Sequence, residues 1–162
     1  MRNRIIPAAM LATLGVLAGC GDPDSLNDVS GDILSVQSVD GEVIVLAQAP
    51  GLLTAAKIAF DAAKWQAGHL TGVDGLALTF YVPTVDRFGK KGMDVALGMR
   101  FEAADLAKVE WKNLFFTNIL DLATINEVTP FGRDWMMDFC GDSSNAKFHG
   151  TFCFKALAAL AR

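Results

Sequence analysis

Histidine is scarce in this chain: there are two among 162 residues, His69 and His149, and they stand far apart. Neither belongs to a His-x-x-x-His pair, and the chain has no Gly-x-Ser-x-Gly stretch and no glycine-rich phosphate loop. The three cysteines lack the paired spacing of a zinc site. The sequence therefore offers no local catalytic motif, no metal site and no sign of a cofactor.

An excess of positive charge is also missing. The chain carries 14 basic and 18 acidic residues, a formal net charge of −4. A mildly acidic domain has no electrostatic basis for binding the phosphate backbone of nucleic acid. We therefore expect no nucleic-acid partner.

Hydrophobic runs long enough to cross a membrane are absent as well. The apolar stretch from Ile5 to Leu17 has about 13 residues, whereas a membrane-spanning helix needs roughly 20. A transmembrane anchor with an incidental cysteine is thus the weaker interpretation of this stretch. The stronger one follows from the residues on either side of it.

Arg2 and Arg4 precede the apolar run, and Leu17-Ala18-Gly19-Cys20 ends it. A charged start, a short apolar segment and a small-residue cleavage site form an export signal. With a cysteine directly after the small residues, the stretch resembles the lipobox of bacterial lipoproteins. The resemblance implies diacylglyceryl transfer to the Cys20 thiol, cleavage before Cys20, and acylation of the new amino terminus with a chain such as palmitate.

This resemblance predicts a protein of the bacterial cell envelope, attached to a membrane through the lipid on Cys20. Gly21 stands where an aspartate would retain a lipoprotein in the inner membrane of enteric bacteria. In a diderm host this favours the outer membrane, facing the periplasm. We expect residues 1–19 to be the signal peptide, residues 20–32 to be the lipidated cysteine and a polar tether, and residues 33–162 to be a single α+β domain.

Cys140 and Cys153 remain if Cys20 carries lipid. An even number of thiols in an exported chain indicates a disulfide. The bond would close a loop of about 14 residues, which contributes roughly 3 kcal/mol in the chain-entropy model. The alternative is two buried thiols that act as small hydrophobic side chains.

The first half of the domain has clear periodicities. Asp40-Gly41 between two apolar runs predicts a hairpin of strands over 33–39 and 42–48. An alanine-rich apolar face predicts a helix over 52–67, ended by Gly68. Alternation predicts strands over 76–82 and 93–101, joined by a long loop over 84–92 with a basic tip.

The second half is less regular. Short helices are expected over 102–109 and 114–123, whereas 131–140 fits either a helix or an irregular strand. We expect a loop over 141–145, an extended segment over 148–154 and a closing helix over 154–161. The predicted fold is α+β: an antiparallel sheet of about four strands, one long helix packed on it, and C-terminal helices.

Two places are candidate binding sites. The stretch from Pro130 to Trp135 gathers Arg133, Asp134 and Trp135, and tryptophan and arginine are enriched at binding hot spots. The alternative is a solvated or locally paired Arg133 and Asp134 beside a core Trp135. Phe88, at the basic tip of the 84–92 loop, is the second candidate, as an exposed contact residue.

Taken together, these features favour a non-catalytic structural or binding lipoprotein, with an envelope protein as its partner besides the membrane. One alternative is an accessory lipoprotein of a secretion or conjugation apparatus. Another is a periplasmic hydrolase, for which Ser143 or Ser144, together with the nearby His149, would be candidate members of a catalytic triad. No catalytic residue is assigned, because the two histidines lie outside any motif.

Overall fold

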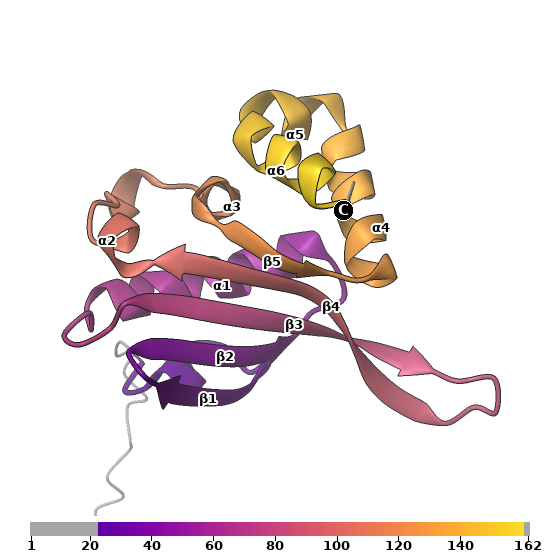
Figure 1. The fold of residues 1–162 in the computed structure, drawn as a ribbon, viewed down its shortest axis with the longest axis horizontal. Coiled ribbons are helices and arrows are strands. Elements are labelled where there is room, and N and C mark those ends of the chain that lie inside the picture. Colours follow the sequence, from indigo (N-terminus) through magenta and orange to yellow (C-terminus); the bar gives the residue numbers. More distant parts are fainter. Residues whose placement is uncertain (1–22, 161–162) are drawn as a thin grey trace, which may run out of the picture.

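A computed structural model describes residues 23–160 of the chain, which form a five-stranded sheet and several helices (Figure 1). The strands lie in the order β1-β2-β3-β4-β5, so each one neighbours the next in sequence. Their bounds are β1 Ile33–Val39, β2 Glu42–Gln48, β3 Gly75–Val85, β4 Lys91–Glu102 and β5 Thr124–Val128. The α+β class is as predicted, with five strands in place of about four.

The β1–β2 hairpin forms where the sequence predicts it. Asp40 and Gly41 both adopt positive φ, 48° and 82°, as a two-residue turn between antiparallel strands requires. The side chains of β2 alternate between buried and half-buried positions, with Val43, Val45 and Ala47 buried. The other face of β2 is only partly covered.

The long helix α1 spans Leu52–Ala67, the predicted range. Its alanine face is fully buried, and the small side chains let the helix axis approach the sheet closely. Because α1 returns the chain to the end of the sheet where β2 began, β3 runs parallel to β2. The prediction of an entirely antiparallel sheet is therefore wrong for this pair of strands.

The connection between β4 and β5 contains less helix than expected. It consists of α2 (Ala103–Leu106), the 3₁₀ turns η2 (Trp111–Asn113) and η3 (Phe116–Asn118), and α3 (Ile119–Leu122). The predicted helix over 114–123 is wrong in its first half, because Leu114 and Phe115 have extended backbones. The unpredicted strand β5 pairs with β4 at the edge of the sheet.

The C-terminal region consists of α4 (Pro130–Gly141), α5 (Ser143–Phe148) and α6 (Gly150–Leu160). The expected loop over 141–145 is wrong, because the Asp142 carboxylate accepts hydrogen bonds from the backbone N–H groups of Ser144 and Asn145 and starts α5. The expected extended segment over 148–154 is also wrong. Phe152 is buried and Phe154 exposed on α6.

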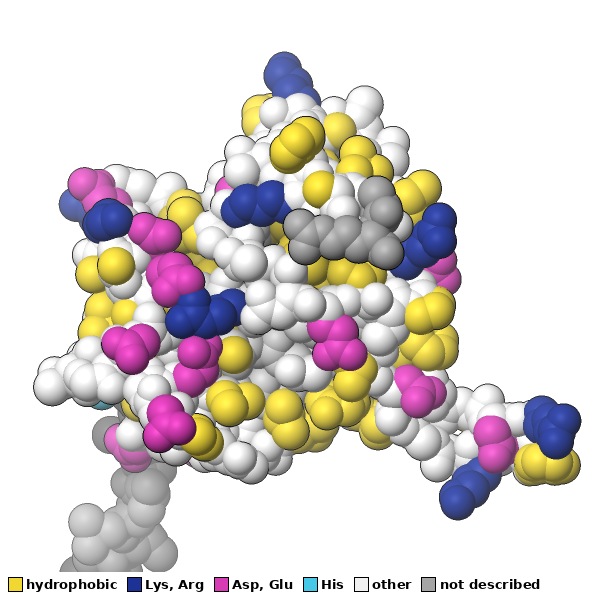
Figure 2. All heavy atoms as spheres, viewed as in Figure 1, with side chains coloured by type: hydrophobic (Ala, Val, Ile, Leu, Met, Phe, Trp, Pro, Cys, Tyr) yellow, Lys and Arg dark blue, Asp and Glu magenta, His cyan; other side chains and the backbone are white. Residues whose placement is uncertain are grey.

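One hydrophobic core lies between the sheet and the helices. Val45, Leu78 and Met99, in register on β2, β3 and β4, point into it. Ile44 and Ala77 lie on the opposite, partly exposed face. In Figure 2 the β3–β4 hairpin projects from the body, and its end carries basic side chains around a hydrophobic one.

The folded part of the chain begins earlier than residue 33. In the turn η1 (Leu26–Asp28), Leu26 is buried in the core with 3% of its surface exposed. The indole Nε1 of Trp65 on α1 donates a 3.0 Å hydrogen bond to the carbonyl oxygen of Pro23. The polar tether predicted over 20–32 is thus packed on the domain from Pro23 onward. Cys20 and the signal segment lie outside the described residues.

Candidate functional site

The β3–β4 hairpin carries Phe88, the predicted exposed contact residue. β2 pairs with β3 only as far as Tyr81, so the outer part of the hairpin is a two-stranded ribbon that ends at the Val85–Lys91 pair. The Asp86 carboxylate organises the loop by accepting hydrogen bonds from the backbone N–H groups of Phe88 and Lys90, at 2.8 and 2.9 Å. The loop is therefore held together by its own hydrogen bonds.

This loop presents an aromatic ring surrounded by cations. Phe88 is 80% exposed, and the guanidinium carbon of Arg87 lies 4.7 Å from its ring centroid. Lys90 and Lys91 follow on the same turn and are also exposed. We call residues 86–91 the hairpin tip. Its chemistry suits an acidic surface with room for one apolar side chain.

The predicted cluster of Arg133, Asp134 and Trp135 lies on α4. Arg133 and Asp134 are exposed, and neither forms an ion pair within residues 23–160. Trp135 is half-buried and packs against the core. The helix thus places the three residues next to one another, but it directs the two charges to solvent and the indole inward.

The two remaining cysteines lie at bonding distance, as predicted. Their Sγ atoms are 2.02 Å apart and their Cα atoms 5.6 Å apart, and the bond joins α4 to α6. Cys153 is buried and Cys140 half-buried. The interpretation of the pair as two separate thiols is therefore not supported.

His149 lies in a buried polar network that sequence reasoning missed. The Oγ1 of Thr117 lies 3.0 Å from its Nε2, and the Oδ2 of Asp121 lies 3.4 Å from its Nδ1. Thr117 comes from η3, Asp121 from α3 and His149 from the junction between α5 and α6, so only tertiary packing brings the three together. The proposed triad residues Ser143 and Ser144 are instead exposed at the start of α5.

The connectivity of Thr117, His149 and Asp121 matches that of a hydroxyl nucleophile, a base and an orienting carboxylate. Its surroundings differ from those of a hydrolase site, because Thr117 and His149 are only 6% and 5% exposed. The second oxygen of Asp121 accepts a 2.8 Å hydrogen bond from the backbone of Phe152. The network therefore joins α3 to α6, and a substrate carbonyl has no open path to the threonine oxygen.

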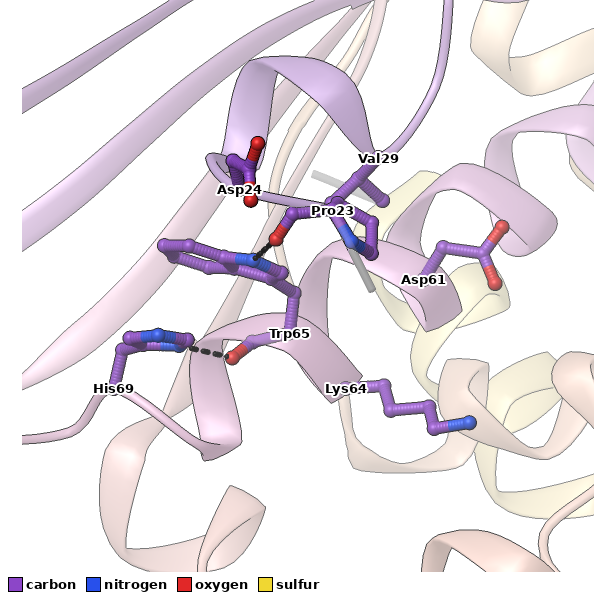
Figure 3. Close-up of a pocket in the computed structure, with 7 residues that line it drawn as sticks. All are labelled: Pro23, Asp24, Val29, Asp61, Lys64, Trp65 and His69. Atoms are coloured by element: carbon purple, nitrogen blue, oxygen red, sulfur yellow. Dashed lines mark hydrogen bonds between the residues drawn. The ribbon is translucent and has the colours of Figure 1, made fainter. Parts of the chain in front are cut away.

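A cleft of about 700 Å³ lies between the N-terminal segment and the last turns of α1 (Figure 3). Pro23, Asp24 and Val29 line one side, and four residues of α1 and the turn after it line the other: Asp61, Lys64, Trp65 and His69. We call it the Trp65 cleft. No sequence signal predicted it, because its two walls are far apart in the chain.

Trp65 and His69 form the floor of this cleft. Their rings stack with centroids 3.9 Å apart, and the Nδ1 of His69 lies 2.8 Å from the carbonyl oxygen of Trp65 (Figure 3). His69 therefore has a backbone partner in place of the carboxylate that would orient a catalytic base. Within residues 23–160, no group of three histidine, cysteine or acidic side chains is placed to bind a metal ion.

The partly exposed face of the sheet carries one further charged group. Arg100 on β4 donates a 2.8 Å hydrogen bond from Nε to Glu42 on β2 and also pairs with Glu102. The hydrogen bond to Glu42, with the charges of both carboxylates, raises the pKa of Arg100 above its ordinary value. The guanidinium crosses over Gly75, where a Cβ would lie 2.6 Å from Nη2. This group ties three strands together.

Comparison of the chain with models of protein families, with curated proteins and with solved structures finds no match in any of the three. Among the helices of residues 23–160, none combines the length and the apolar character that crossing a membrane requires.

Proposed function

We propose that this chain is a lipid-anchored protein of the bacterial cell envelope with a non-catalytic binding role. The observation that carries the proposal is the stretch Leu17-Ala18-Gly19-Cys20 after a short apolar run. Pro23, three positions after the cysteine that would carry the lipid, is already held against the domain by Trp65. The paired Cys140 and Cys153 support export, since disulfides persist in oxidising compartments.

The binding role is supported by the surfaces of the domain. The hairpin tip presents an exposed Phe88 beside Arg87, and aromatic residues and arginine are enriched at protein interfaces. Lys90 and Lys91 add positive charge that would attract an acidic partner. Arg133 and Asp134 on α4 offer a second polar surface. An accessory subunit of a secretion or conjugation apparatus would use such contacts, and it is the narrower form of this proposal.

Lipid attachment is tested by labelling cells with a clickable palmitate analogue. The Cys20→Ser variant should lose the label and accumulate as an unprocessed or soluble precursor. A variant with both Cys140→Ser and Cys153→Ser is the matched control, because it keeps Cys20 and should keep the label. Equal labelling of the Cys20→Ser variant and the parent would refute the proposed anchor.

A periplasmic hydrolase is the second candidate, because Thr117, His149 and Asp121 are linked in the same way as the hydroxyl, base and carboxylate of a catalytic triad. Incubation with a fluorophosphonate probe separates the two functions. The binding proposal expects no covalent adduct on the folded protein, since Thr117 is buried. An adduct that disappears in the Thr117→Ala variant would favour the hydrolase.

A further inference from the structure

The Trp65–Pro23 hydrogen bond fixes the point where the N-terminal segment meets the fold. Burial of Leu26 holds the same segment from its other side, so Pro23 is attached at the C-terminal end of α1. Three peptide steps separate Pro23 from Cys20. At about 3.6 Å per residue, the Cα of Cys20 lies within roughly 11 Å of the Cα of Pro23, whatever path the chain takes.

This limit decides which end of the domain meets a membrane. We propose that the Trp65 cleft lies on the bilayer surface, in contact with zwitterionic phospholipid headgroups. The proposal rests on the proposed lipid anchor, and it adds an orientation and a contact surface to it. The 13-residue tether expected over 20–32 would let the domain rotate freely relative to the membrane. With only residues 20–22 between the lipid and Pro23, the cleft stays close to the headgroups.

The lining of the cleft fits such headgroups. Asp24 provides a carboxylate for the ammonium group of a headgroup, and Lys64 provides an ammonium for its phosphate. Asp61 also lines the cleft, but its carboxylate already pairs with Lys57 on α1. The Trp65 indole, half-buried between them, is the side chain that membrane proteins place at the interface with water. Lys57 and Lys64 balance the charges of Asp24 and Asp61, so the cleft has no net charge that would favour an anionic bilayer, and the expected surface is zwitterionic.

The same orientation places the hairpin tip away from the membrane. β3 begins at Gly75, a short turn after His69, and runs to Val85 at the outer end of the hairpin. Ten residues of strand span about 33 Å. In Figure 1 the hairpin extends to the side opposite the loops that end α1 and start β3. Phe88 and its cations therefore face the aqueous compartment, where they can reach a protein partner.

Fluorescence quenching tests the orientation in the lipidated full-length protein. The protein is reconstituted in vesicles of phosphatidylcholine and phosphatidylethanolamine that contain a lipid with a nitroxide on its headgroup. Trp111→Phe and Trp135→Phe leave Trp65 as the single emitter. The matched reporter keeps Trp65 and adds Phe88→Trp, so that the Trp65–Pro23 hydrogen bond stays in place and quenching at position 88 is obtained from the emission that the second tryptophan adds. We expect quenching at Trp65 to exceed quenching at position 88 about twofold or more, given their separation.

A spacer variant tests the role of the short connection. Insertion of a Gly/Ser segment of about 20 residues after Gly21 should reduce the quenching of Trp65, because the domain could then leave the surface. Quenching that is equal at the two positions, or unchanged by the spacer, would overturn the orientation. Flotation of the vesicles is measured first: protein that fails to float contradicts the anchor itself, and the orientation with it.

Discussion

Gly132 on α4 contacts the backbone of Ala96 on β4 directly. A Cβ at position 132 would lie far closer to the Ala96 carbonyl oxygen than the van der Waals contact distance of the two atoms, and Gly132 is buried. Beside this contact the Thr129 hydroxyl donates a 2.7 Å hydrogen bond to the carbonyl oxygen of Val95. The glycine thus sets how closely α4 approaches the sheet. Packing alone therefore accounts for the presence of Gly132 in the Pro130–Trp135 stretch.

The Gly132→Ala variant should therefore lose stability, by about 2–4 kcal/mol, because a backbone carbonyl cannot move aside as a flexible side chain can. Gly141→Ala on the same helix is the control, since a Cβ there meets nothing within 4 Å. Urea unfolding of the two variants gives the comparison. Equal midpoints would mean that α4 shifts on the sheet at little cost.

The β1–β2 turn provides a second test. Gly41 has φ of 82°, and a Cβ there would lie 2.6 Å from Oδ2 of Asp74. Gly41→Val should lose about 1–3 kcal/mol through both the positive φ and this contact. Gly31→Val, where a Cβ has open space, should change little. An unchanged melting temperature for Gly41→Val would contradict the observed turn.

The buried histidine network should show the cost of an unpaired polar group. Thr117→Val keeps the shape of the side chain but removes the hydroxyl that lies 3.0 Å from Nε2 of His149. We expect a loss of about 1–3 kcal/mol in the free energy of unfolding. Thr117→Ser retains the hydroxyl and should lose less. The opposite ranking in chemical denaturation would show that the hydrogen bond contributes little.

The Cys140–Cys153 bond should mainly stabilise the C-terminal helices. Replacing both cysteines by alanine should lower the free energy of unfolding by about 3 kcal/mol, because the bond closes a short loop between α4 and α6. Hydrogen exchange should rise in α4–α6 more than in β2, β3 and β4, which have their own core. Alkylation of both thiols in the unreduced protein would show that the bond is absent.

Much of the first half of the domain could be predicted because its signals are local. Asp40-Gly41 specifies a turn by the φ angles that its residues tolerate, and the flanking apolar runs define β1 and β2. The alanine face of α1 likewise gave the exact range Leu52–Ala67. In these segments the hydrophobic periodicity and the local backbone preference favour the same secondary structure, and tertiary packing did not change it.

The candidate sites were less predictable. Phe88 could be placed at an exposed tip because the alternation of β3 and β4 stops on either side of it. The Trp65 cleft and the Thr117–His149–Asp121 network could not be found, because each combines residues that meet only after folding. The segment from Phe148 to Phe154 was expected to be extended, whereas it ends α5 and forms the start of α6, with Phe152 packed in the core.

The sequence alone thus predicted the cysteine pairing, the first hairpin and the long helix, since each depends on neighbouring residues or on the number of cysteines. The export and lipidation signal stays a prediction from the sequence. Only the tertiary structure decided the parallel β2–β3 pair, the edge strand β5, the three C-terminal helices and the docking of Pro23 on Trp65. These features depend on contacts between distant segments. Their free energy comes from burial of surfaces that no short stretch of sequence contains.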